Sequence, residues 1–305
     1  MPLVWLNNEF REESDASISV RDTGLLHAAG VFTTMRSYAG RVFRAAQHLQ
    51  RLRNSCEALS IPFAYDDEGL IRAMQELLAR NELTDARLRL TITRGHAQGN
   101  EQEGLRLVPT ILLTAVPFEP YPAEYYQRGM TVILLDAQKL NPYDMQAGHK
   151  TLNYFSRLAA LRSANANAAG EALWFNVHNY LESGSISNVF IVKKNVLVTA
   201  PTADELLDPA VAELTAYPKS AVLPGITRGA IFDIAREAKI GVTLASITVN
   251  DLLDADEVFL TNSVMEIMPV CRIERRVIGN DKPGTITKKL VKLLREMIAK
   301  ETKTP

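Results

Sequence analysis

The 305-residue sequence has few features typical of a membrane protein, a disulfide-rich secreted protein or a nucleic-acid-binding protein. Its only cysteines, Cys56 and Cys271, lie far apart and form no disulfide framework, so we expect reduced thiols in a cytoplasmic protein. No apolar run approaches the roughly 20 residues of a membrane span. The apolar start, residues 1–6, lacks the basic segment and cleavage site of a signal peptide. With 34 Lys and Arg against 35 Asp and Glu, the chain is not globally basic, and we expect no nucleic-acid partner.

Common catalytic motifs are also missing. The sequence has no G-x-G-x-x-G, no Walker A motif, no G-x-S-x-G and no H-E-x-x-H. The five histidines are scattered, and no pair of them has the spacing of metal ligands. We therefore expect no metal site.

The composition and length predict an ordinary globular protein of two domains. Apolar residues make up 47% and charged residues 23%, and a domain typically has about 100–200 residues. The clearest boundary is the proline-rich stretch 116–122, because prolines at this density favour extended, hinge-like backbone. We expect a small domain over 1–117, a linker over 118–123 and a larger domain over 124–305.

Hydrophobic periodicity predicts a mixture of helices and strands, which indicates an α/β (α+β) fold. Before the linker, runs with strand character cover 31–38, 88–93 and 110–115, and runs with helical spacing cover 45–60 and 71–78. After the linker, we expect strands at 131–135, 172–175, 189–192 and 257–261, and helices at 153–164, 227–238 and 287–300.

Three local patterns could take part in catalysis or ligand binding, although each alone has an ordinary structural interpretation. Lys150 precedes a helix; such a lysine is usually a solvated charge, but in an apolar, enclosed site it loses its proton more easily and can form a Schiff base. Pro224 and Gly225 break the chain before a helix for which Thr227 is a good N-cap, and such a helix start attracts phosphate. The segment 181–190 is rich in small hydroxyl residues and reads as a polar turn.

Taken together, these segments resemble the fold-type IV family of pyridoxal-phosphate enzymes. The family includes branched-chain aminotransferases, D-amino-acid aminotransferases and aminodeoxychorismate lyases. The resemblance covers nearly the whole chain through six matching segments: 31–36, 48–52, 150–154, 183–188, 223–228 and 261–270. It implies a small domain and a larger pseudo-barrel domain with the site between them. It also implies a homodimer whose partner chain contributes to the substrate pocket.

The resemblance implies roles for individual residues. Lys150 would form the Schiff base with pyridoxal 5′-phosphate and move the substrate proton. Tyr154 would donate to the cofactor's phenolate oxygen; the alternative is a core aromatic on the next helix. A further set would hold the phosphate: Arg51, Gly225, Ile226, Thr227, Ser263 and Val264.

The partner of the pyridine nitrogen departs from the family pattern. The family has a glutamate five residues before the Asn of Ser-Asn-Val-Phe, and here that position is Ser183, with Glu182 one place earlier. Because side chains alternate along a strand, this shift would turn Glu182 away unless a bulge restores it. Register favours Ser183, and both residues stay candidates.

Substrate residues and the reaction are less specific. Phe32, Arg36, Arg94 and His27 are candidates for the substrate pocket, and either arginine could instead form a structural ion pair. An aminotransferase that works by a ping-pong mechanism on an amino acid and a 2-oxo acid is the favoured function. A neutral Ser183 would instead suit an aminodeoxychorismate lyase that releases pyruvate, and a non-catalytic cofactor-binding protein is a third hypothesis.

Overall fold

A computed structural model describes residues 1–98 and 106–303, and these divide into two compact units. The first unit consists of Met1–Glu119, His149–Asn153 and Ile298–Pro305; the second consists of Pro120–Gly148 and Tyr154–Met297. The sequence did not indicate that the five residues around Lys150 belong with the first unit. No helix in the described part of the chain is long and apolar enough to cross a membrane.

The first unit contains a six-stranded antiparallel sheet in the order β2-β1-β6-β5-β3-β4. Its strands are β1 (Leu3–Leu6), β2 (Glu9–Glu12), β3 (Gly30–Tyr38), β4 (Arg41–Val42), β5 (Ala86–Gln98) and β6 (Arg106–Pro117). Two short elements, η1 (Glu13–Asp15) and α1 (Thr23–His27), lie between β2 and β3.

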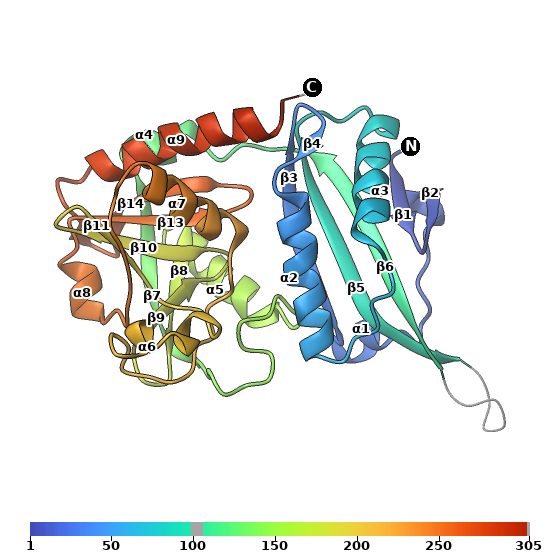
Figure 1. The fold of residues 1–305 in the computed structure, drawn as a ribbon, viewed down its shortest axis with the longest axis horizontal. Helices are drawn as coiled ribbons and strands as arrows, with labels where there is room; N and C mark the ends of the chain where they lie inside the picture. The colour runs from blue at the N-terminus through green and yellow to red at the C-terminus, as the bar shows by residue number, and fades with distance from the viewer. Residues whose placement is uncertain (99–105, 304–305) are drawn as a thin grey trace. The chain divides into compact units, whose positions relative to one another are not determined.

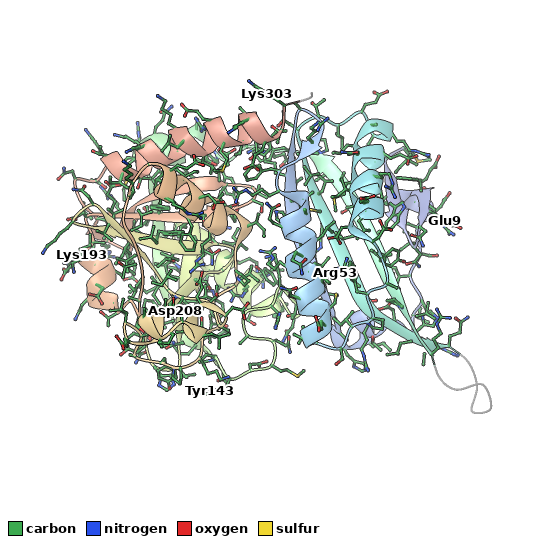
Figure 2. All side chains as sticks on the ribbon, viewed as in Figure 1. Glu9, Arg53, Tyr143, Lys193, Asp208 and Lys303 are labelled. Atoms are coloured by element: carbon green, nitrogen blue, oxygen red, sulfur yellow. The ribbon has the colours of Figure 1, made fainter. Side chains whose placement is uncertain are left out.

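Helices α2 (Ala45–Ala58) and α3 (Asp67–Arg80) lie on one face of this sheet, as Figure 1 shows. Alternation along β3 sends Val31 and Met35 into the core beneath the helices. Arg53, labelled in Figure 2, donates from α2 to the Tyr65 carbonyl at 3.1 Å and to Asp67, so it ties α2 to the start of α3. The opposite face of the sheet therefore carries Phe32 and the other alternate residues.

The second unit contains a mixed nine-stranded sheet in the order β12-β11-β10-β13-β14-β7-β8-β9, with β15 paired to β14. Its strands are β7 (Met130–Leu140), β8 (Glu171–Asn176), β9 (Leu181–Gly184), β10 (Asn188–Lys193), β11 (Val196–Thr199), β12 (Val242–Leu244), β13 (Glu257–Asn262), β14 (Glu266–Ile273) and β15 (Arg276–Val277). Most of β8, β10 and β13 is buried, which explains their nearly continuous apolar sequences.

The helical elements of the second unit are α4 (Ala123–Arg128), α5 (Phe155–Ala166), η2 (Glu205–Leu207), α6 (Pro209–Ala212), α7 (Ile226–Glu237), α8 (Val249–Leu253) and α9 (Thr285–Glu301), whose last turn belongs to the first unit. The expected mixed α/β class with two sheets is confirmed. Each strand and helix expected from periodicity is present, with ends that differ by a few residues.

Candidate functional site

Lys150 is held by backbone hydrogen bonds at the edge of the first unit's sheet. The Phe32 N–H donates to the Lys150 carbonyl and the Leu152 N–H donates to the Gly30 carbonyl, each at 2.9 Å. An antiparallel bridge joins Val31 to Thr151, so the segment around Lys150 continues the sheet beside β3. The Lys150 amine lies 4.7 Å from the centroid of the Phe32 ring. The lysine is thus a fixed group beside an aromatic face.

Arg51 lies on α2 in a small buried network. Its Nη2 donates to the Thr33 hydroxyl at 3.0 Å, and the same hydroxyl lies 2.7 Å from His48 Nδ1. Burial lowers the pKa of His48 well below its ordinary value, and the charges of Arg51 and Lys150 lower it further. The spacing of His48 and Arg51 predicts that they share a helix face, but sequence reasoning did not identify Thr33 or His48 as site residues.

Arg89 is another residue that sequence reasoning missed. Its guanidinium lies 3.6 Å from the centroid of the Phe32 ring, and its Nε donates to the Thr91 hydroxyl at 3.1 Å. The register pairs Phe32 with Thr91 and Thr34 with Arg89, so these side chains share the sheet face opposite the helices. Alternation along the two strands was the signal that could have found Arg89. Phe32 therefore contacts two cationic groups, those of Lys150 and Arg89.

The other substrate candidates lie in different surroundings. The Arg36 guanidinium lies 3.5 Å from the Phe118 ring centroid and 3.9 Å from the Asp85 carboxylate, which agrees with the structural interpretation of this arginine. Arg94 and His27 are exposed. Among these candidates, the structure places Phe32 beside the Lys150 amine.

In the second unit, a β-bulge occurs at Glu182. Trp174 pairs with Ser183 and Phe175 pairs with Leu181, so Glu182 is the extra residue of β9. Leu181 and Phe175 belong to one hydrophobic core, whereas Trp174 belongs to another on the opposite face of β8. This bulge is one of the two arrangements that the sequence left open. The bulge interrupts the simple alternation of side chains on which the preference for Ser183 rested.

The Glu182 carboxylate is 6% exposed and is held by three donors. Its Oε1 accepts from Asn176 Nδ2 at 2.7 Å, and its Oε2 accepts from the Ser220 hydroxyl at 3.3 Å and the Ala221 N–H at 3.1 Å. Burial raises the pKa of Glu182 to about 7, even though these hydrogen bonds favour the charged form. Glu182 is therefore a carboxyl group that can exist in either protonation state near neutral pH.

Arg157 and Tyr154 hold the turn that follows Glu182. Arg157 Nη1 donates to the Gly184 carbonyl at 2.9 Å, the Ser185 carbonyl at 3.2 Å and the Ser183 hydroxyl at 3.3 Å. The Tyr154 hydroxyl donates to the Ser185 carbonyl at 3.0 Å. Ser183 is thus turned toward Arg157, and the proton that Tyr154 would offer to a cofactor is used here within the chain.

Glu171, at the start of β8, is a second buried glutamate that sequence reasoning missed. It accepts from the N–H groups of Ala172, Ser185 and Ile186 and from the Ser187 hydroxyl, at distances of 2.9–3.2 Å. Burial raises the pKa of Glu171, and the donors oppose this. An apolar strand that opens with a glutamate gives no sequence signal for this contact with the distant turn.

Helix α7 begins at a glycine. Gly225 is the N-cap, with extended backbone (φ −68°, ψ 135°), and it has no side chain to cap the helix. The expectation that Thr227 is the N-cap is therefore wrong. The extended backbone ends at Gly225, so Thr227 lies inside the first turn, where it is buried. The first N–H groups of a helix have no intrahelical acceptor, so those of Ile226 and Thr227 are suited to an anion.

Gly225 lies against Asn188. A Cβ at Gly225 would come within 1.9 Å of Asn188 Oδ1, and Asn188 Nδ2 donates to the Leu223 carbonyl at 3.0 Å. Arg228, in the first turn of α7, is buried, and its guanidinium donates two hydrogen bonds of 2.7 Å to the Glu205 carboxylate. Both contacts fix the start of α7, and only glycine fits at its N-cap.

The turn between β13 and β14 holds Ser263 and Val264. Asn262 Oδ1 accepts from the N–H groups of Val264 and Met265, each at 2.8 Å. The Val264 N–H, expected to contact phosphate, is therefore used inside the turn in this structure. Ser263 lies at the tip of the turn and is half-buried.

Comparison with known proteins gives consistent results. Residues 30–273 match the model of a family described as "Amino-transferase class IV". A Methanocaldococcus jannaschii protein, provisionally named a branched-chain-amino-acid aminotransferase, is 35% identical over 97% of this chain and 96% of its own length. The D-alanine aminotransferase of Bacillus licheniformis is 28% identical over 98% of each chain.

A crystal structure of the Escherichia coli branched-chain amino acid aminotransferase has the same fold. It superposes with a TM-score of 0.85 and 26% identity, and the match covers 99% of this chain and 96% of that one. The similarity thus extends across both units.

Proposed function

This chain belongs to the class IV aminotransferase family, and we propose that it is a pyridoxal-phosphate-dependent aminotransferase acting on an amino acid and a 2-oxo acid. Lys150 carries the proposal: its backbone is fixed against β3 and its amine lies beside the Phe32 ring. When bound, pyridoxal phosphate supplies an aldehyde and an electron-accepting ring. Lys150 would provide the amine for the Schiff base and then, as general base, move a proton at the substrate Cα in a ping-pong reaction.

The phosphate of this cofactor fits the start of α7. The helix dipole and the N–H groups of Ile226 and Thr227 favour a dianion, and the N-cap Gly225 supplies no side-chain cap that would compete with it. Gly225 allows Asn188 to approach the start of this helix, which a Cβ at position 225 would prevent. We propose that Arg51 and Ser263 complete the donors to the phosphate.

Glu182 suits the pyridine nitrogen. A carboxylate beside the ring keeps this nitrogen protonated and so strengthens electron withdrawal by the ring. Glu182 has a pKa of about 7, close enough to neutrality to share a proton with such a nitrogen, and its bulge places it with Ser183 on one face of β8. We therefore favour Glu182 for this role over Ser183, which faces Arg157.

Arg89 is our candidate for the substrate carboxylate. Its guanidinium contacts the same Phe32 ring as the Lys150 amine, and a guanidinium binds a carboxylate bidentately. We expect Arg89→Gln to raise KM for the amino acid by about 10–100-fold, in line with the loss of a charge-assisted pair. Arg94→Gln, at another exposed position of the same strand, is the matched control and should change KM by less than about twofold. Equal effects of the two changes would contradict the assignment.

The lyase is the second candidate function. Its support was a neutral Ser183 at the pyridine nitrogen, and the bulge at Glu182 weakens that support. The non-catalytic alternative would require a protein that binds the cofactor and turns over neither class of substrate.

The visible absorption spectrum of the purified protein tests the function. We expect a band that single amino acids bleach without an acceptor, and L-leucine, L-valine and D-alanine added separately would identify the donor and its handedness. Lys150→Ala should lack the band. A band that no amino acid bleaches would favour the lyase, to be tested with aminodeoxychorismate, and no band after added pyridoxal phosphate would contradict the role of Lys150. Light scattering should give the mass of the homodimer that we expect.

A further inference from the structure

We propose that Thr33 and His48 are positioning residues that orient the Arg51 guanidinium toward an organic phosphate. The proposal rests on the proposed function, because it takes the cofactor phosphate as the ligand of Arg51. It assigns roles to two buried residues that do not themselves contact the ligand.

The three residues form a chain of hydrogen bonds through the Thr33 hydroxyl. Thr33 lies on β3 and is 0% exposed, and His48, 1% exposed, and Arg51 lie one turn apart on α2. Arg51 Nη2 lies 3.0 Å from Thr33 Oγ1, which lies 2.7 Å from His48 Nδ1. The Thr33 hydroxyl therefore links β3 to the Arg51 guanidinium of α2, the helix that packs on this strand.

The available protons determine which group donates in each of these hydrogen bonds. A guanidinium only donates, so Thr33 Oγ1 must accept from Arg51 and has one proton left to donate. His48 Nδ1 is the acceptor that the described residues offer to this buried proton. An N–H at Nδ1 would leave the Thr33 proton buried without a partner, which costs free energy. Nδ1 is therefore unprotonated, and the hydrogen of the neutral ring is on Nε2.

The charge state of His48 agrees with this direction. Burial is the largest cause that lowers the pKa of His48, followed by the positive charges of Arg51 and Lys150. The neutral ring can thus act as a permanent acceptor at physiological pH. With the Thr33 proton directed at His48, a lone pair of Oγ1 is directed at Arg51 Nη2. One nitrogen of the planar guanidinium is then fixed, and its other N–H groups are held in one orientation.

Binding of pyridoxal phosphate and of pyridoxal tests the proposal, since the two aldehydes differ only in the phosphate. We expect the isosteric change Thr33→Val to raise the Kd for pyridoxal phosphate about tenfold, as for the loss of one charge-assisted hydrogen bond. The Kd for pyridoxal should stay within twofold. Thr33→Ser keeps the hydroxyl and should retain the wild-type ratio of the two constants.

His48 variants test the acceptor separately. An Asn at position 48 places its amide oxygen near Nδ1, whereas a Gln places its amide near Nε2. His48→Asn should therefore retain most of the preference for the phosphorylated aldehyde, and His48→Gln should lose about tenfold of it. Thermal melting of each apoprotein checks that the variants fold. If Thr33→Val does not fold, the comparison of His48→Asn with His48→Gln still tests the proposal.

A double-mutant cycle with Arg51→Ala shows whether the effect acts through the arginine. In that background, Thr33→Val should leave the ratio of the two dissociation constants unchanged. A drop of the same size in both backgrounds would overturn the proposal. The proposal would also be overturned if Arg51→Ala lowered the preference for pyridoxal phosphate over pyridoxal while Thr33→Val and His48→Gln left it unchanged. The proposed function would then stand. A wild-type protein that binds pyridoxal phosphate no more tightly than pyridoxal would instead contradict the phosphate site itself.

Discussion

Glu171 and Glu182 are both buried glutamates of the second unit, but their carboxylates are used to different extents. A carboxylate has about four lone-pair positions. Each oxygen of Glu171 accepts two hydrogen bonds, all from its neighbour Ala172 and the turn 185–187. Among the described residues, Glu182 accepts one bond at Oε1 and two at Oε2, from Asn176, Ser220 and Ala221.

The number of unused lone pairs distinguishes a structural carboxylate from one that can bind a ligand. Glu171 has no capacity left and organises a turn. Glu182 can accept one more hydrogen bond, and its donors come from two other parts of the chain, the end of β8 and the segment before α7. Burial alone does not separate the two, because it raises the pKa of both.

The sharpest test of this comparison is the effect on turnover. We expect Glu182→Ala to lower kcat by about 10²–10³-fold, because it removes the electrostatic partner of the proposed pyridine nitrogen. Ser183→Ala should change kcat by less than about threefold, since its hydroxyl contacts Arg157. Steady-state kinetics of both variants decides, and the reverse pattern would sink the Glu182 assignment.

Glu171 should instead control stability. Glu171→Gln places an amide NH₂ against groups that donate to the carboxylate, which should cost about 2–4 kcal/mol and lower the melting temperature by roughly 5–10 °C. Differential scanning calorimetry would measure the shift, with Glu182→Gln as the matched change. A larger loss in Glu182→Gln than in Glu171→Gln would contradict the distinction.

The pH dependence of stability gives a smaller effect. In the apoprotein, burial raises the pKa of Glu182 from 4.5 to about 7, so the folded state binds more protons than the unfolded state between these values. Stability from Glu182 is therefore present below pH 4.5 and is lost as the pH rises toward 7, by up to about 3 kcal/mol. Urea unfolding of the wild type minus that of Glu182→Gln isolates this term, because Glu171 is common to both. A difference that stays constant from pH 4.5 to 8 would rule it out.

The smallest expected effect concerns Asn176. Its amide donates to Glu182 Oε1 at 2.7 Å and favours the charged carboxylate. Asn176→Ala should therefore raise the pKa of Glu182 further, by about one unit or less. The pH at which urea unfolding shows the stability from Glu182 to be lost should rise by that amount. Ser183→Ala should leave this pH unchanged.

The sequence predicts the regular elements well because their periodicity is local. The strand over 31–38, the helix over 45–60 and the helix over 227–238 correspond to β3, α2 and α7. The N-cap of α7 was wrong by two residues, because a good capping residue inside the first turn does not show where the extended backbone ends.

The parts of the site that the sequence did not predict depend on pairing between distant segments. The bulge at Glu182 is defined only against β8, so the count of residues along β9 could not show it. Arg89 and Thr33 gain their importance from the register of β3 with β5 and from the packing of α2. Lys150 was found through a resemblance, but its hydrogen bonds to β3 require the three-dimensional fold.

The division of the first unit into three chain segments has a consequence for folding during synthesis. Residues 1–119 can form their sheet and helices as they leave the ribosome, but the edge of β3 stays open until the strand around Lys150 is made. Closing that loop orders Lys150 and the sheet edge in the same step. Residues 298–303 also belong to the first unit, so we expect their removal to destabilise the first unit although the second unit keeps its sequence.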